Sequence, residues 1–152
     1  LLADAKALAD QLQLGARIHF LGSRNQADVA KLMRGVRVFV QHSRVAEDGD
    51  SEGNPVAVME AQLSGLPVVA TRHAGIPEVV LDGTTGLLVE EGDVKGMTAA
   101  IERLLLDPVL CRQLGEAGRI RVSDSFTLDH HLQDLSWFLE QTHAKAIVRR
   151  DA

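Results

Sequence analysis

The sequence has a single cysteine, no long hydrophobic run and no cluster of basic residues, and each absence excludes a class of protein. One cysteine in 152 residues, Cys111, cannot form a disulfide within the chain. It stands in a helical pattern beside Leu110 and Leu114, so we expect a buried thiol and a reducing compartment. No apolar run approaches the ~20 residues that a membrane-spanning helix needs. The sequence therefore predicts a cytoplasmic globular protein.

The charge balance excludes nucleic acid as an expected partner. The formal net charge is -5, and the basic residues are scattered apart from Arg149 and Arg150. The length suits one domain, so we treat 1–152 as a single unit. The chain opens on Leu1 rather than Met, in an amphipathic pattern without the parts of a signal peptide. We expect that the chain is cut from a longer one.

Hydrophobic periodicity predicts alternating helices and strands. The helices are expected at 1–12, 27–33, 55–64, 93–106, 108–123 and 128–148, and the strands at 17–21, 36–40, 67–71 and 86–89. The strand at 36–40 is a near-continuous apolar run, which is typical of a buried parallel strand. The alternation predicts an α/β fold with an incomplete doubly wound, Rossmann-like parallel sheet of about four strands and flanking helices.

The most informative stretch is EGNPVAVMEA, which begins at Glu52. Asn54 and Pro55 are typical of an N-cap and a first-turn proline, and Gly53 allows a close backbone approach. Amides in the first turn, such as that of Val56, have no intrahelical acceptor and suit a phosphate oxygen or a sugar hydroxyl. Glu60 lies four residues further on the same face, about 6 Å along the axis. That offset matches the distance from a phosphate to a ribose.

Glu60 is surrounded by apolar residues, so its carboxylate needs hydroxyl groups or a cation as partners. A ribose diol would supply them. The alternative is that Glu60 reaches solvent at the helix edge and that Glu52 is a solvated loop acid.

The spacing of glutamate, seven residues and glutamate resembles the retaining GT-B glycosyltransferases. Glu52 and Glu60 have this spacing, and the resemblance continues in RIHFLG, VRVFVQHS, GLPVVATRHAGIPEVV and DGTTGLLVEEGD. It covers 17–93 with specific motifs and the closing helices at 93–148 only loosely. The resemblance implies the C-terminal half of a GT-B fold, with 1–152 as a partial nucleotide-sugar-binding domain.

The resemblance also implies roles for individual residues. Glu52, as the catalytic glutamate, would contact donor sugar hydroxyls near the transferring carbon, and Glu60 would bind the ribose. Main-chain groups after the first glutamate would hold sugar and phosphate, here Gly53, Asn54, Pro55 and Val56. The loop near Ser23 and Arg24 would hold the base.

The function implied is transfer of a hexose, with retained configuration, from a UDP-sugar or GDP-sugar to a glycan or lipid-linked acceptor. The loop VAEDGDSEGNP resembles enzymes of bacterial polysaccharide synthesis. No cofactor is implied, and peripheral membrane association of the full enzyme stays open. Two alternatives remain, a non-catalytic nucleotide-sugar-binding remnant and a sugar-nucleotide epimerase of the same fold.

Related enzymes carry a glycine-rich strand end and a basic pair before this region, and an acceptor-binding domain before that. Neither precedes Leu1, and a departing diphosphate needs compensating charge. We therefore expect this chain alone to be inactive. The strand at 17–21 would lose its usual neighbour, so we expect it to pair beside 36–40, to swap between chains or to stay poorly packed.

Other polar residues have competing interpretations. Asp48 and Asp50 could hold a divalent metal, but their loop offers no other obvious ligands, so we expect no metal site. His42 and Ser43 either line a substrate site or cap a strand. The segment 73–78 either lets a glycine approach the donor or turns tightly into a short helix. We expect 82–86 to be a structural turn, and His130, His131 and Trp137 to serve packing.

Overall fold

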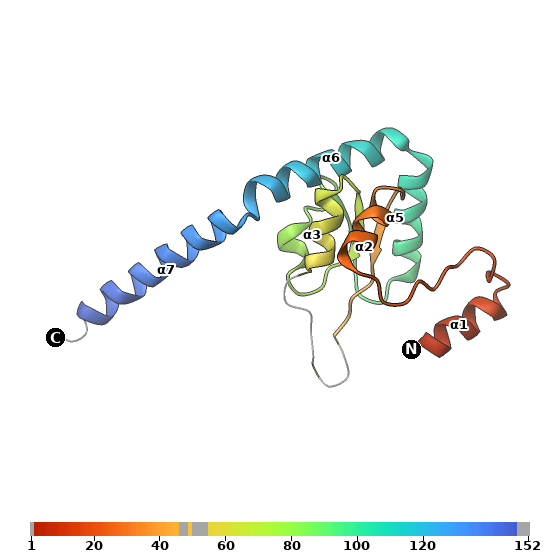
Figure 1. Cartoon of the computed structure of the whole chain (residues 1–152), viewed down its shortest axis with the longest axis horizontal. Helices are drawn as coiled ribbons and strands as arrows, with labels where there is room; N and C mark the ends of the chain where they lie inside the picture. The colour runs from red at the N-terminus through yellow and green to blue at the C-terminus, as the bar shows by residue number, and fades with distance from the viewer. Residues whose placement is uncertain (1, 46–48, 50–54, 149–152) are drawn as a thin grey trace. The chain divides into compact units, whose positions relative to one another are not determined.

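The computed structural model describes residues 2–45, 49 and 55–148, and the side chains of these except 134 and 141–148. They form two compact units, Leu1–Lys31 and Leu32–Ala152, each of which is described by itself. The second unit contains the sheet and the helices α3 to α7 (Figure 1). All buried hydrophobic residues of the described chain except Ala9 lie in this second unit.

Two helices mark the first unit. α1 spans Leu2–Gln11, and α2, Gln26–Met33, begins in the first unit and ends in the second. Asn25 precedes α2 and acts as its cap: its side chain accepts a hydrogen bond from the Asp28 amide at 2.9 Å and donates one to the Asp28 carboxylate at 3.0 Å. Both helices expected here are thus confirmed.

The expected strand at 17–21 does not form, which corrects the number of strands. No residue of 2–31 belongs to a strand, and Ile18, Phe20 and Leu21 are all exposed. A strand forms only where its backbone groups find a ladder partner, and the first unit supplies none. Of the three outcomes expected for this segment, the structure has the poorly packed one.

The sheet has three parallel strands in the order β1-β2-β3. They are β1 (Phe39–Gln41), β2 (Val68–Thr71) and β3 (Gly86–Val89). β2 is the central strand and all four of its residues are buried, which explains its unbroken apolar sequence. The α/β class is confirmed, with three strands in place of about four. β1 begins later than expected because only 39–41 reaches β2 in the ladder.

Five helices follow β1 in the described part of the chain, and the ends of all but the short α4 lie within two residues of the expected ones. They are α3 (Val56–Leu63), α4 (Ile76–Val79), α5 (Val94–Leu106), α6 (Pro108–Ser125) and α7 (Leu128–Val148). Asp93 caps α5 by accepting a hydrogen bond from the Gly96 amide at 2.8 Å. Asp107 caps α6 in the same way, and Pro108 fills the first turn, where no amide hydrogen is needed.

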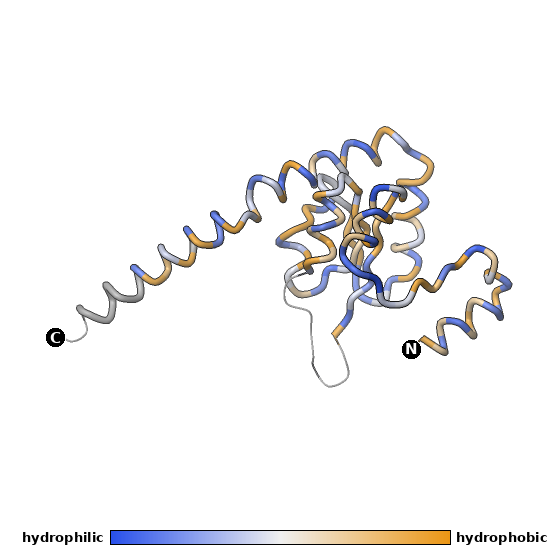
Figure 2. The backbone as a smooth tube through the Cα atoms, viewed as in Figure 1, coloured by the Kyte–Doolittle hydropathy of each residue, from blue (hydrophilic) through white to orange (hydrophobic). Residues whose placement is uncertain are grey.

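The hydrophobic core lies between the sheet and the helices on its two sides (Figures 1 and 2). Val69 and Leu87 point from the sheet toward Met97 and Leu104 of α5 and Leu114 of α6. The neighbouring strand residues point to the other face because side chains alternate along a strand. α3 contacts β1 and β2, and its Val58 and Ala61 are fully buried.

Two glycines in α6 allow this helix to approach α3 closely. A Cβ atom at Gly115 would overlap the carbonyl oxygen of Gly65, and one at Gly118 would lie 3.0 Å from the Gln62 side-chain amide. Gly65 itself has a φ of 76° and ends α3 in a Schellman turn. The glycines weaken α6 as an isolated helix but permit its packing.

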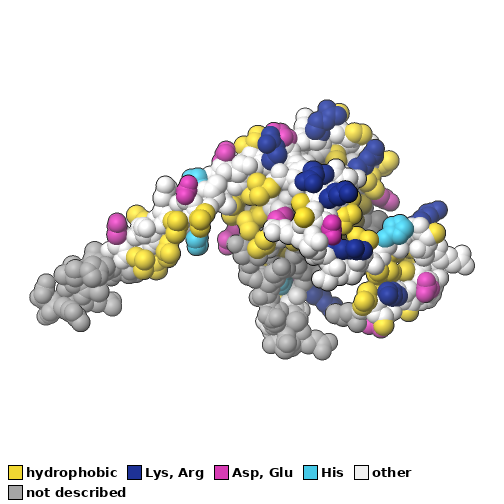
Figure 3. Space-filling model, in the orientation of Figure 1, with side chains coloured by type: hydrophobic (Ala, Val, Ile, Leu, Met, Phe, Trp, Pro, Cys, Tyr) yellow, Lys and Arg dark blue, Asp and Glu magenta, His cyan; other side chains and the backbone are white. Residues whose placement is uncertain are grey.

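α7 presents apolar side chains to solvent (Figure 3). Those that are exposed are Leu128, Leu132, Leu135, Trp137, Phe138 and Leu139. The packing role expected for Trp137 is therefore not seen among the described residues. No described helix is long and apolar enough to cross a membrane.

Candidate functional site

The carboxyl ends of the three parallel strands meet at one edge of the sheet. β1 leads there into His42 and Ser43, β2 into Arg72 and His73, and β3 into a pair of glutamates. In open α/β sheets, ligands bind at this carboxyl edge. The side chains at this edge therefore form the candidate site.

Thr71 links the ends of β1 and β2. Its buried hydroxyl donates a hydrogen bond to the Ser43 carbonyl at 2.6 Å and accepts one from the Ser43 amide at 3.0 Å. Gln41 adds a bond from its side-chain amide to the Ser43 hydroxyl at 3.2 Å. The backbone of Ser43 thus continues the pairing of the two strands, which supports strand-end capping for Ser43.

His73 and Glu91 link the ends of β2 and β3. His73 Nδ1 lies 2.7 Å from Glu91 Oε1, and the histidine side chain is only 2% exposed. The other carboxylate oxygen accepts a hydrogen bond from the Val45 amide at 3.1 Å. One carboxylate therefore joins segments that follow all three strands.

These contacts lower the pKa of Glu91. The hydrogen bond with His73 has the largest effect, the Val45 amide adds to it, and attraction from His73 and His42 contributes further. Burial acts in the opposite direction, but the pKa stays below the ordinary value of 4.5. The carboxylate is thus held in its charged form.

The turn after α4 is held by charged side chains. Arg72 pairs with Asp82 and with Glu90, the latter at 3.3 Å. Asp82 also accepts a hydrogen bond from the Leu88 amide at 3.0 Å. Every one of these contacts is internal to the fold, so the expectation of a structural turn at 82–86 is confirmed.

The segment after β2 is a tight turn into the short helix α4. His73 donates from its amide to the Thr71 carbonyl at 2.9 Å, and Ala74 has a φ of 43°. Gly75 is the N-cap of α4 with a φ of -77°, so the turn does not use its conformational freedom. This agrees with the turn interpretation of 73–78.

The amino terminus of α3 lies at the same carboxyl edge, because a crossover helix runs antiparallel to the strands that it connects. α3 begins at Val56, and Pro55 is its N-cap. The expected N-cap, Asn54, is thus one residue too early, a difference within the usual uncertainty of a helix end. Val56 is 58% exposed, and the N-cap residue Pro55 makes no side-chain capping hydrogen bond. The amides of the first turn of α3 have no acceptor further back in their own helix.

Glu60 lies one turn inside α3 and is half-buried. It is four residues beyond Val56, so the two share a face of the helix. The structure thereby supports the predicted juxtaposition of a helix amino terminus and a carboxylate. The assignment of this carboxylate to a ribose stays a prediction.

Several residues predicted for the site lie outside the described residues or in the first unit. Glu52, Gly53 and Asn54 lie outside the described residues, as do Asp48 and Asp50. Ser23 and Arg24 belong to the first unit and are exposed, and their role toward a base stays a prediction. The described residues contain no cluster of three or more potential metal-ligating side chains.

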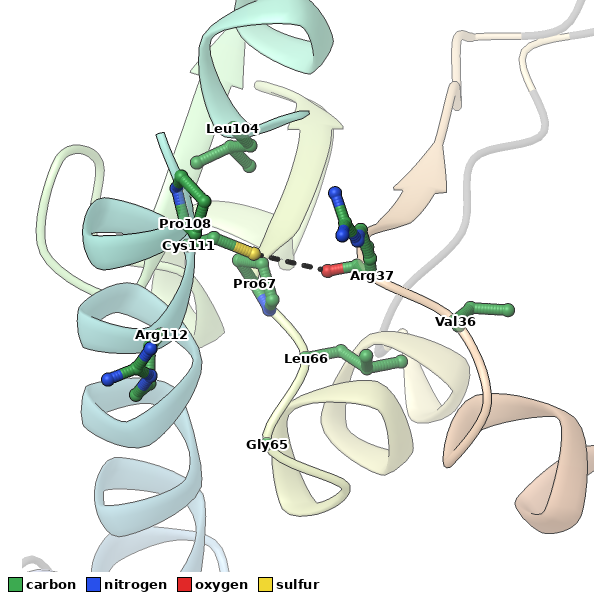
Figure 4. Close-up of a pocket in the computed structure, with 9 residues that line it drawn as sticks. All are labelled: Val36, Arg37, Gly65, Leu66, Pro67, Leu104, Pro108, Cys111 and Arg112. Atoms are coloured by element: carbon green, nitrogen blue, oxygen red, sulfur yellow. Dashed lines mark hydrogen bonds between the residues drawn. The ribbon is translucent and has the colours of Figure 1, made fainter. Parts of the chain in front are cut away.

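A pocket of about 280 Å³ lies at the opposite, amino edge of the sheet (Figure 4). Its lining includes Val36 and Arg37 before β1, and Leu66 and Pro67 before β2. Cys111 of α6 faces it, and its thiol donates a hydrogen bond to the Arg37 carbonyl at 3.4 Å. The thiol is half-buried, which corrects the expectation of a buried one: it borders an open pocket instead of packing in the core.

Thr71 and Glu91 are site residues that the sequence interpretation missed. Each comes at or just after the carboxyl end of an expected strand, at 67–71 and 86–89. Parallel strands bring such ends to one edge, so their positions were a usable signal.

The described residues define an α/β domain with a parallel sheet and flanking helices, in which a helix amino terminus lies at the carboxyl edge. The family model of the glycosyl transferases group 1 matches residues 2–121, so the chain belongs to this family. Its structural neighbours are GT-B enzymes. The resemblance to GT-B glycosyltransferases is thereby confirmed, and the retained configuration stays a prediction.

Relatives in bacteria make polysaccharides and glycolipids. The chain is 33% identical over 82% of its length to the amylovoran biosynthesis glycosyltransferase AmsK of Erwinia amylovora, and covers 30% of that protein. It is 45% identical over 54% of its length to the GDP-mannose-dependent alpha-(1-6)-phosphatidylinositol monomannoside mannosyltransferase of Mycolicibacterium smegmatis, and covers 22% of it. The chain thus spans less than a third of these relatives.

A solved structure shows the same fold with a nucleotide bound. Anabaena Alr3699/HepE in complex with UDP is 26% identical to this chain, with a TM-score of 0.80. The match covers 92% of this chain and 36% of the other.

Proposed function

We propose that this chain is the donor-binding part of a retaining glycosyltransferase that uses a nucleoside-diphosphate sugar. The observation that carries the proposal is the amino terminus of α3 at the carboxyl edge, with Glu60 one turn inside it. First-turn amides without an acceptor in their own helix and a positive helix dipole favour a diphosphate. The half-buried carboxylate is suited to accept hydrogen bonds from a ribose diol.

The remaining roles follow the resemblance. Glu52 orients the donor sugar, and main-chain groups of Gly53 to Val56 bind the sugar and the diphosphate. Ser23 and Arg24 contact the base. The reaction uses no cofactor and no metal, because amides and basic protein groups compensate the charge of the departing diphosphate.

The donor is a UDP-sugar or a GDP-sugar. The bound UDP of the Anabaena neighbour supports the first, and the mannosyltransferase relative named as GDP-mannose-dependent supports the second. A hexose passes to a glycan or lipid-linked acceptor in bacterial polysaccharide or glycolipid synthesis. Parts of the full-length protein beyond this chain bind the acceptor, so this chain alone is inactive.

Calorimetric titration of the folded chain with UDP, GDP, UDP-glucose and GDP-mannose tests the proposal. We expect one nucleotide series to bind, and Glu60→Ala to weaken it about tenfold or more through the loss of charged hydrogen bonds. Glu102→Ala is the matched control, since Glu102 is an exposed glutamate of α5. Binding of neither series, or equal effects of the two variants, would contradict the donor-site assignment.

A further inference from the structure

The segment Ser43–Val45 is fixed at both of its ends to the carboxyl edge of the sheet. Thr71 holds the backbone of Ser43 by two hydrogen bonds. Glu91 holds the amide of Val45 at 3.1 Å. In the sequence, this segment is the beginning of the β1–α3 connection, and Pro55, at the other end of that connection, is fully buried.

Glu91 reaches Val45 in a defined orientation because His73 holds its second oxygen. The 2.7 Å distance between Nδ1 and Oε1 is typical of a hydrogen bond with a charged partner. The imidazole ring is only 2% exposed, so its packing restricts its rotation. The Glu91 carboxylate is 34% exposed and would otherwise sample several rotamers.

We propose that His73 and Glu91 are positioning residues that fix the backbone at Val45 and thereby set the affinity for the nucleotide-sugar donor. This inference rests on the proposed function, because the β1–α3 connection leads from Val45 to the amino terminus of α3. Val45 and the amino terminus of α3 lie at the same carboxyl edge of the sheet, so a fixed Val45 backbone keeps this edge preorganised for the donor. Releasing Val45 removes this preorganisation and weakens donor binding.

The neighbouring charges agree with this role. Glu91 faces His73 from the end of β2 and His42 from the end of β1, and both attract its negative charge. Arg72 is engaged with Asp82 and Glu90, so it does not substitute for His73. Glu90 is next to Glu91 in sequence but contacts Arg72, which makes it a suitable control.

The test compares His73→Ala and Glu91→Ala with two controls. His73→Asn places an amide nitrogen near the position of Nδ1 and can still donate to Glu91. Glu90→Ala removes the adjacent carboxylate and leaves the His73–Glu91 pair intact. Hydrogen exchange of the Val45 amide, measured by NMR, reports the positioning, and calorimetry with UDP and GDP reports the affinity.

We expect both alanine variants to speed exchange at Val45 and to weaken nucleotide binding, each about tenfold, which is the loss of one hydrogen bond. His73→Asn should restore most of the slow exchange at Val45 and most of the nucleotide affinity. Glu90→Ala should change neither the exchange rate nor the affinity. A merely structural histidine would lower stability without a selective effect at Val45 or a rescue by asparagine. Glu91→Ala changes a partly exposed side chain, so it keeps the test valid if His73→Ala does not fold.

Unchanged exchange at Val45 in Glu91→Ala overturns the positioning role. Faster exchange with unchanged nucleotide affinity overturns the link to the donor. Failure of the unmodified chain to bind either nucleotide refutes the proposed function and, with it, this link, while the exchange measurement still decides the positioning role.

Discussion

The hydroxyl of Thr71 makes two hydrogen bonds to the backbone of Ser43, a residue 28 positions earlier in the chain. It is thus both donor and acceptor, and it extends the pairing of β1 and β2 beyond the last ladder residue. Because Thr71 is fully buried, its hydroxyl depends on these two bonds for its hydrogen-bond partners.

Thr71→Val should lower the free energy of unfolding by about 1–3 kcal/mol, because two backbone groups of Ser43 lose their partner. Thr71→Ser keeps the hydroxyl and is the control, with a smaller loss from the missing methyl group. Urea denaturation measures both variants. Equal losses would mean that packing, and not the hydrogen bonds, makes Thr71 important.

Gly115→Ala should destabilise the protein by about 3 kcal/mol, through overlap of the new methyl group with the Gly65 carbonyl. Gly35→Ala is the control, because a Cβ there would meet its nearest atom at an ordinary 3.6 Å. Thermal unfolding of the two variants provides the comparison. A neutral Gly115→Ala would show that α6 can move away from the end of α3 at little cost.

Arg121 and Arg119 lie on the same helix, α6, but have different contacts. Arg121 donates to the carbonyls of Val79 at 3.1 Å and Glu78 at 2.7 Å, whereas Arg119 pairs with exposed Glu116. Arg121→Met should cost about 1–2 kcal/mol of stability, because it removes charged hydrogen bonds to α4. Arg119→Met should cost less than Arg121→Met, because an exposed ion pair contributes little to stability. Chemical denaturation that ranks the two in the reverse order would contradict this assignment.

Glu91 should make stability depend on pH in the acid range. Its pKa in the folded state is below 4.5, so the unfolded chain binds the proton more readily. Its contribution is fully present above the unfolded value and is lost as the pH falls through the lower folded value. The stability difference between the unmodified protein and Glu91→Gln should therefore shrink from pH 6 toward pH 3. A difference that stays constant over this range would show that the charge of Glu91 has no role.

The helices of the second unit were predictable because their signals are local. Asp93, Asp107 and Pro108 mark helix starts by short-range hydrogen bonding and backbone geometry, which neighbouring residues alone determine. The positions of α5 and α6 followed from these residues. The prediction of a strand at 17–21 was wrong because the apolar residues there do not indicate whether another strand is present to pair with them.

The candidate site was predictable only where a motif is contiguous. EGNPVAVMEA placed Val56 and Glu60 on one helix, and both lie in α3, although that helix begins one residue later than expected, with Pro55 as its N-cap. Thr71 and Glu91 were missed because their partners are distant in the sequence. His73 was noticed as a turn residue, but its pairing with Glu91 depends on the register of β2 and β3.

The sequence by itself determined the α/β class, the family motifs and the helix that carries Glu60, since each depends on residues within a few positions of one another. Only the tertiary structure decided that three strands form, and that His73, Glu91 and Val45 meet at one edge. The physical reason is that a helix satisfies its backbone within its own segment. A strand and a strand-end site are satisfied only by segments far away in the chain.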